Sequence, residues 1–104
     1  MSTYPVDIKS TTASGIATHD AGGTAGPGRA LGLFVSKEGG QAATTVKIKD
    51  NTTVLAEFLI PATNQPTAQG MTTYIQFPGT GFRAATALKF QIVTTATSVT
   101  LLHG

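Results

Sequence analysis

The sequence predicts an all-β protein, a single antiparallel β-sandwich or jelly-roll of about seven to eight short strands. Three observations lead to this prediction. Apolar and polar residues alternate at period two, Gly and Pro separate the alternating segments, and no long stretch has helical periodicity. With 104 residues the chain is expected to form one domain, residues 1–104, in which residues 1–12 could be an extended N-terminal arm.

The segment 44–60 is predicted to form a hairpin. Apolar residues alternate with Lys47 and Lys49, so one face of the first strand is buried and the other meets water. Asp50 and Asn51 follow, and both residue types tolerate turn dihedrals. In the second strand, the residues predicted to share one face are Val54, Ala56, Phe58 and Ile60.

Further strands are expected where β-branched and aromatic residues are concentrated, at 73–77, 88–94 and 98–102, with a weaker candidate at 6–10. Segment 31–35 is apolar on both faces, as in a strand covered by another sheet or by a partner subunit. The predicted core consists of Leu33, Val35, Val46, Ile48, Phe58, Phe77, Phe90, Ile92 and Val99.

The remaining segments are predicted to be connections. Segments 22–28 and 61–70 are rich in Gly, Pro and polar residues and should be exposed loops. Residues 82–88 could form one turn of helix, but a strand followed by a bend is preferred because one turn of weak propensity is marginal.

Composition and charge exclude several kinds of partner. Only 12% of the residues are charged and the net charge is +2, too little for binding to a phosphate backbone to dominate, so no nucleic acid partner is expected. Without Cys there is no disulfide framework and no thiolate zinc site. The N-terminus lacks the features of an export signal, and no apolar run is long enough to span a membrane.

Residues 79–84 match the letters of the GxGxxG/A dinucleotide-binding pattern. That pattern requires a helix whose N-terminus faces the pyrophosphate, and an acidic residue some twenty positions further on. No Asp or Glu follows Gly81. The segment is therefore interpreted as a glycine turn between two strands.

Two His and several carboxylates are the groups that could carry chemistry. His19, Asp20 and His103 could together ligate a metal, but they are far apart in sequence with no helical or hairpin spacing to hold them together. Nucleophilic catalysis needs a Ser or Thr beside a base that a third group orients, and the two isolated His give no local pattern that would identify such a Ser or Thr. The carboxylates that paired-carboxylate hydrolysis would need to bring together are Asp7, Asp20, Glu38, Asp50 and Glu57. We expect no enzyme activity, no catalytic residues, no cofactor and no metal.

Three surface features have simple structural interpretations. The sequon at Asn51 is expected to serve as a turn, and Lys47 and Lys49 are expected to keep a strand face soluble rather than bind an acidic partner. A sugar-binding platform would have to use Tyr4 or Tyr74, since the chain has no Trp. Either Tyr is also compatible with simple packing.

Four segments occur in a characteristic order: 29–35, 45–51, the glycine turn before Phe82, and 98–104. From Arg29 to Gly104, about three quarters of the chain, this order resembles that of small virion-associated β-sandwich proteins of tailed bacteriophages, with their LxGIxV strand, VKVxD hairpin and SVTVxYG ending. The chain departs from this pattern at His103, where an aromatic residue is common, and in the length of the 61–70 loop.

The resemblance implies a structural protein that decorates or cements a capsid. Such a protein would bind the major capsid protein or another virion protein, form a symmetric homo-oligomer with a trimer favoured, and be located in the virion after assembly in the host cytoplasm. The low charge fraction agrees with a subunit that has several covered faces. The alternatives are a glycan-binding module on a tail or fibre and an adaptor or tail-tube-associated subunit.

Overall fold

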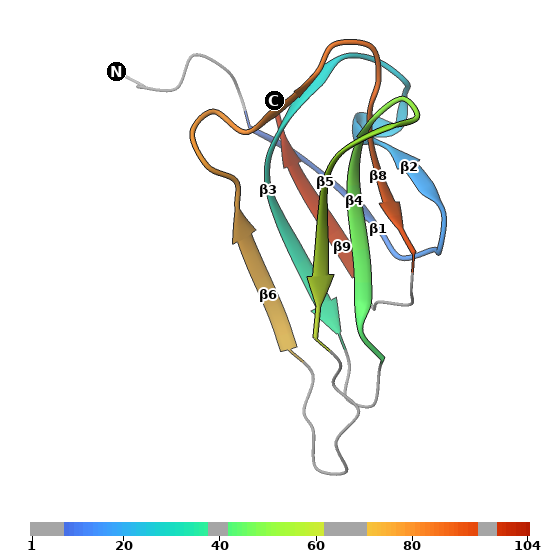
Figure 1. Ribbon diagram of the computed structural model, residues 1–104, viewed down its shortest axis with the longest axis vertical. Coiled ribbons are helices and arrows are strands. Elements are labelled where there is room, and N and C mark those ends of the chain that lie inside the picture. The colour runs from blue at the N-terminus through green and yellow to red at the C-terminus, as the bar shows by residue number, and fades with distance from the viewer. Residues whose placement is uncertain (1–7, 38–41, 62–70, 94–97) are drawn as a thin grey trace.

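The computed structural model describes residues 8–37, 42–61, 71–93 and 98–104, which form two antiparallel β-sheets packed face to face (Figure 1). The first sheet has the order β1 (Lys9–Ala13), β9 (Ser98–His103), β3 (Gly28–Lys37), β6 (Met71–Gln76), and β7 (Phe82–Ala84) also pairs with β3. The second sheet has the order β2 (Thr18–Asp20), β8 (Leu88–Ile92), β4 (Thr44–Asp50), β5 (Thr53–Ile60). The prediction of an all-β sandwich is confirmed.

The strands lie close to their predicted positions. The hairpin at 44–60 and the strands around 31–35, 73–77, 88–94 and 98–102 are confirmed, with ends that differ by a few residues. The described residues hold nine strands, and β2 is the strand that was not expected. It is short, and it precedes a 3₁₀ turn, η1 (Ala21–Gly23), which overlaps the start of the predicted loop 22–28.

Two further expectations concern the segments at 82–88 and at the N-terminus. Residues 82–84 form strand β7 and a bend precedes β8, so the strand was the correct alternative to the helix. Residues 9–12 of the expected arm belong to β1, which pairs along its whole length with β9, and residues 1–7 lie outside the described residues. Residues 62–70 of the second predicted loop also lie outside them.

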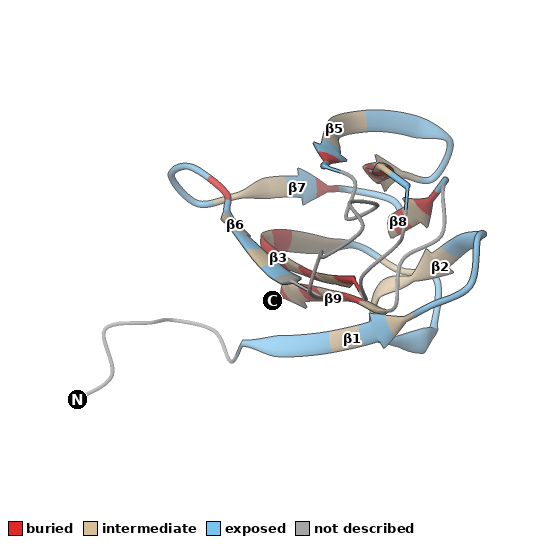
Figure 2. Cartoon of the chain, turned by 90° about the horizontal axis from the view of Figure 1, so that it is seen from below, coloured by how far each residue is buried: buried red, intermediate tan, exposed pale blue. Residues whose placement is uncertain are grey.

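The core lies between the two sheets, and the buried residues, red in Figure 2, alternate with less buried ones along the strands β4, β8 and β9. Strand β3 is central in the first sheet, because it pairs with β9, β6 and β7. Among the described residues, Phe90 in β8 of the second sheet has the largest fully buried side chain. Eight of the nine predicted core residues are buried, the exception being Phe58, which is half-buried on the edge strand β5.

Aromatic rings close one side of the sandwich. The rings of Phe58 and Phe77 are stacked with centroids 5.1 Å apart, and the ring of Phe82 lies tilted against Phe77 at 5.1 Å. These contacts connect β5 of the second sheet to the chain between β6 and β7 of the first sheet. Phe58 is therefore half-buried because it covers the edge of the core.

A bulge in β5 overturns one detail of the predicted hairpin. Ile48 pairs with Ala56 but Lys49 pairs with Val54, so Leu55 is an extra residue in β5. A bulge of this kind reverses the alternation beyond it. Val54 accordingly lies on the outer face, exposed, and not on the inner face with Ala56.

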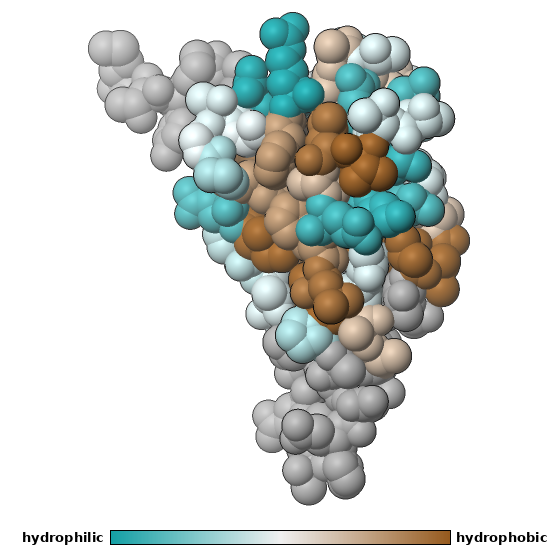
Figure 3. All heavy atoms as spheres, viewed as in Figure 1, coloured by the Kyte–Doolittle hydropathy of each residue, from teal (hydrophilic) through white to brown (hydrophobic). Residues whose placement is uncertain are grey.

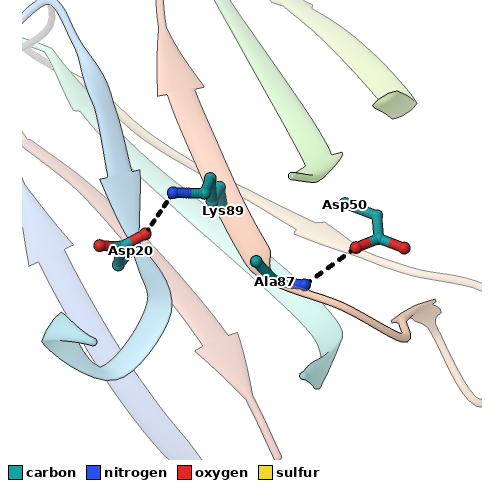
Figure 4. Close-up of polar contacts among 4 residues, drawn as sticks. All are labelled: Asp20, Asp50, Ala87 and Lys89. Carbon is teal, nitrogen blue, oxygen red and sulfur yellow. Dashed lines mark hydrogen bonds and ion pairs between the residues drawn. The ribbon is translucent and has the colours of Figure 1, made fainter. Parts of the chain in front are cut away.

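Asp50, at the end of β4, fastens the β4–β5 hairpin to the bend before β8 (Figure 4). Its carboxylate accepts hydrogen bonds from the backbone N–H groups of Ala87 at 2.9 Å, Thr86 at 3.1 Å and Ala85 at 3.2 Å. The N–H of Asn51 in turn donates to the carbonyl of Ala87 at 2.7 Å. The hydrogen bond from Ala87 is the main reason that the pKa of Asp50 is lowered; desolvation opposes this, and Thr86 and Ala85 lower the pKa further.

Lys37, at the end of β3, is buried at the other end of the sandwich. Its ammonium group donates hydrogen bonds to the carbonyl oxygens of Ala42 and of Pro61, the latter at 2.9 Å. Burial lowers the pKa of Lys37 because desolvation disfavours the charged form. The side chain thus ties the end of β3 to the chain before β4 and the chain after β5.

Replacing Phe90 with Ala tests the position of the core. The ring has no exposed surface, so Phe90→Ala is expected to lower the free energy of unfolding by about 3–5 kcal/mol. The matched control is Gln91→Ala, because Gln91 is the next residue in β8 and faces away from the core; it should change stability by less than about 0.5 kcal/mol. Chemical denaturation measures both, and near-wild-type stability of Phe90→Ala would contradict the assigned core.

Candidate binding site on the outer face of the first sheet

The three candidate metal ligands have separate structural partners. His19 in β2 donates from Nε2 to the carbonyl of Gly15 at 2.8 Å, and its ring lies 5.5 Å from that of Phe90. Asp20 forms an ion pair with Lys89 at 2.8 Å (Figure 4). Among the residues described, no three His, Asp or Glu side chains lie together as a metal site would require.

His103 is buried at the end of β9, and its Nε2 lies 2.9 Å from Oγ1 of Thr11. The same hydroxyl accepts a hydrogen bond from the N–H of Gly22 at 2.7 Å. Desolvation first, and the positive charge of Lys9 second, lower the pKa of His103. Burial therefore favours the neutral ring, and Thr11 links β1, β9 and η1.

The remaining chemical candidates are also accounted for by the fold. Asn51 has a φ of 56° in the turn between β4 and β5, so the sequon does serve as a turn. Lys47 and Lys49 are half-buried on the outer face of the second sheet, with Nζ of Lys49 3.4 Å from Oε1 of Gln91. Glu57 is exposed on β5, whereas the candidates that lie outside the described residues are Tyr4, Asp7 and Glu38.

The glycine-rich segment 79–84 forms a turn that leads into β7. The N–H of Gly81 donates to the carbonyl of Pro78 at 3.1 Å, and Gly79 and Gly81 have φ angles of 60° and 82°. A Cβ on Gly81 would lie 2.0 Å from the carbonyl oxygen of Ala30. Since no helix follows, the dinucleotide-binding interpretation has no structural basis, and the turn is instead pressed against the start of β3.

This turn forms one wall of a pocket on the outer face of the first sheet, which we call the outer-face pocket. Its volume is about 680 Å³, within the range of small-molecule sites. The apolar part of the lining comes from Ile8 before β1, Leu31 in β3, Phe77 after β6 and Leu102 in β9. Tyr74 and Gln76 of β6 line it as well, and Arg29 lies at the end next to Thr80.

Gly32 allows the ring of Tyr74, which lines the pocket, to lie close to the backbone of β3. Gly32 pairs with Gln76 on one side and Leu102 on the other, and a Cβ there would lie 3.1 Å from both Cε1 and the hydroxyl oxygen of Tyr74. The ring of Tyr74 also stacks on Phe34, with centroids 4.5 Å apart. Tyr74 is therefore held on one face and remains 48% exposed on the side that lines the pocket.

Arg29 stands at one end of this pocket, next to a second arginine that lies outside it. Arg29 of β3 pairs in register with Arg83 of β7, which places two cations opposite each other across the strands. Nη1 of Arg29 donates to both the hydroxyl and the carbonyl of Thr80, at 3.0 and 3.2 Å. Within the described ranges neither arginine has an ion-pair partner, and both line a second, shallower cavity of about 240 Å³.

Sequence reasoning pointed to Tyr74 but missed the arginines and Gly32. The two arginines are 54 positions apart, and no local pattern reveals that their strands pair in register. A usable indication was the Gly at position 32 inside an otherwise apolar strand, because glycine within a strand often marks a close approach of another group.

Comparison of the chain with protein-family models, with curated proteins and with solved structures found no match. No helix in the described part of the chain has the length and apolar character needed to cross a membrane. The geometry of the outer-face pocket and of the strand edges is therefore the basis for a functional proposal.

Substitution of the two turn glycines tests the wall of the pocket. Gly81→Ala combines a positive φ with a clash against the backbone of Ala30 and is expected to cost about 3 kcal/mol or more of unfolding free energy. Gly79→Ala has a similar φ but no neighbouring atom within 4 Å, so it should cost only about 1–2 kcal/mol. Equal losses in denaturant titrations would contradict the close contact at Gly81.

The buried His103 predicts how stability depends on pH. Its pKa in the folded protein lies below the ordinary 6.5. The unfolded chain therefore takes up a proton before the folded chain does, and the melting temperature should fall as the pH is lowered from about 7 to about 5. His103→Gln should make this slope shallower, and Lys9→Gln should do so in part, because Lys9 contributes to the lowered pKa.

The measurement is a series of thermal melts at constant ionic strength. The pKa of Asp50 is also lowered. Asp50 loses its contribution to the stability of the fold only as the pH falls below the ordinary pKa of 3.8, which is a separate pH range. A slope between pH 7 and pH 5 that is identical in His103→Gln and in the wild type would refute the assignment to His103.

Proposed function

We propose that the chain is a non-enzymatic structural protein of a tailed-phage virion, a capsid decoration or cement protein that binds the major capsid lattice as a homo-oligomer, with a trimer favoured. The order of its segments resembles such proteins, and an all-β sandwich agrees with their architecture. The observation that carries the proposal is the free edge of strand β5.

Strand β5 pairs with β4 on one side and with no described strand on the other. It is eight residues long and contains one charged residue, Glu57, and no Pro. Leu59 is 71% exposed and Val54 is exposed as well. A long apolar edge is a template for pairing with another chain, and monomeric proteins usually interrupt such edges with charges, Pro or a cover.

Apolar side chains on the outer face of the second sheet are arranged in separate patches. Figure 3 shows the face of the second sheet, on which brown apolar side chains alternate with teal polar ones. Such a surface suits contacts with several neighbours, each of modest area. A cement protein would act mechanically in this way, since many weak contacts across a lattice add up through avidity.

The first test is a mass measurement of the purified protein followed by a capsid-binding assay. A discrete symmetric oligomer that co-sediments with capsids and raises their disruption temperature is the expected result. A monomer that neither binds capsids nor changes their disruption temperature would refute the proposal.

Substitution at the β5 edge provides a sharper prediction. Leu59→Lys should raise the dissociation constant of the oligomer at least about tenfold, because a charge must then be buried or excluded from the contact. Glu57→Gln, two residues away on the same edge strand, is the matched control and should leave assembly intact. Light scattering over a concentration series measures both, and unchanged assembly of Leu59→Lys would show that β5 is not the contact.

A second candidate, a glycan-binding or adaptor module on a tail or fibre, is favoured by the exposed ring of Tyr74 in the outer-face pocket. Aromatic faces beside polar groups are typical of sugar sites. Retention of the protein on host polysaccharide, lost in Tyr74→Ala and accompanied by no binding to capsids, would favour this function over the first.

A further inference from the structure

We propose that the outer-face pocket and the smaller cavity that adjoins it at Arg29 bind an acidic, apolar peptide segment of a partner protein, with an apolar or aromatic side chain in the pocket and a carboxylate on Arg29 and Arg83 in the smaller cavity. The inference rests on the proposed function in one respect, that the partner is another virion protein. Three features of the site lead to this ligand class.

The first feature is the chemistry of the walls. Ile8, Leu31 and Leu102 line one part of the pocket, and the exposed side of Tyr74 lines another. A sugar ring would need hydrogen-bonding groups around its rim, whereas most of this lining is apolar. Burial of an apolar side chain is the interaction that these walls favour.

The second feature is a pair of positive charges with no ion-pair partner in the part of the chain that the structure describes. Like charges directly opposite each other across two strands are destabilising, yet Arg29 and Arg83 occupy such a pair. The strands of the first sheet contain no Asp or Glu, and the described acidic residues, Asp20, Asp50 and Glu57, all belong to strands of the second sheet. A carboxylate bound between the two arginines would remove this repulsion.

The third feature is the fixed position of Arg29. Its Nη1 is held by the hydroxyl and carbonyl oxygen of Thr80, in the turn that Gly81 presses against β3. The other N–H groups of the guanidinium have no acceptor among the described residues. A guanidinium held in this way can bind a carboxylate with less loss of side-chain entropy than a free one. Two arginines are too few for a nucleic acid backbone to be the better ligand.

The test uses a matched pair of small probes, N-acetylphenylalanine and N-acetylphenylalaninamide, which share the ring and differ in the carboxylate. Titration of the full-length protein followed by NMR gives both dissociation constants. We expect the carboxylate probe to bind about tenfold more tightly than the amide, in accordance with a charge-assisted hydrogen bond. Arg83→Gln should weaken this preference because only Arg29 then remains to bind the carboxylate, and Lys47→Gln, on the other sheet, should preserve it in full.

A variant of the pocket itself provides a separate readout. Tyr74→Ala should weaken the binding of both probes while the preference for the carboxylate remains. Equal affinity of the wild type for the two probes, or loss of the preference in Lys47→Gln, would overturn the proposal. So would tighter binding of sodium glucuronate than of N-acetylphenylalanine, because it would identify an acidic sugar as the ligand class.

Capsid binding, measured beside probe binding, separates the failure of this proposal from the failure of the proposed function. Normal probe binding by a wild type that ignores capsids would leave the peptide site in place and refute the virion function. If the wild type binds capsids but shows no preference between the probes, the virion function stands and the peptide site is refuted. If both proposals hold, Arg83→Gln should bind capsids less tightly than the wild type and than Lys47→Gln.

Discussion

The fold depends on burying the inner faces of two sheets against each other with side chains alone. The chain has no Cys, and few charged residues, so packing between the sheets must supply the stability that larger or cross-linked domains obtain elsewhere. Phe90 of the second sheet and Leu33 and Leu101 of the first lie fully within this interface. Every strand register follows from the requirement that such residues point inward, because a shift by one residue would turn them to solvent.

Polar side chains secure the parts of the sandwich that apolar packing cannot. Asp50 binds three backbone N–H groups of the bend before β8, His103 and Gly22 share the hydroxyl of Thr11, and Lys37 binds the carbonyls of Ala42 and Pro61. These contacts satisfy backbone or side-chain groups at strand ends, and most of them join segments that are far apart in sequence. They hold strand ends and connections in place at positions that have no apolar side chains to bury.

The two outer faces of the sandwich differ in charge and in shape. The strands of the first sheet carry cations without acids and a pocket beside Tyr74, whereas the second sheet carries both signs of charge and an edge strand, β5, that no other described strand pairs beyond β4. A subunit that contacts copies of itself through one region and an unlike protein through another needs two such distinct surfaces. The proposed assembly through β5 and the proposed peptide site on the first sheet are thus compatible, because they lie on different sheets.

Period-two alternation determined the fold class, the 44–60 hairpin and more than half of the core, because burial of one strand face leaves a local pattern in the sequence. Strand pairing is not local, and so only the tertiary structure decided that Arg29 lies opposite Arg83 and that Tyr74 leans over Gly32. It also decided that the bulge at Leu55 turns Val54 outward and that a histidine near the end of the chain is buried. Except for the bulge, which lies within a hairpin, these features arise from contacts between segments tens of residues apart, whose register is set by the packing of the whole sandwich.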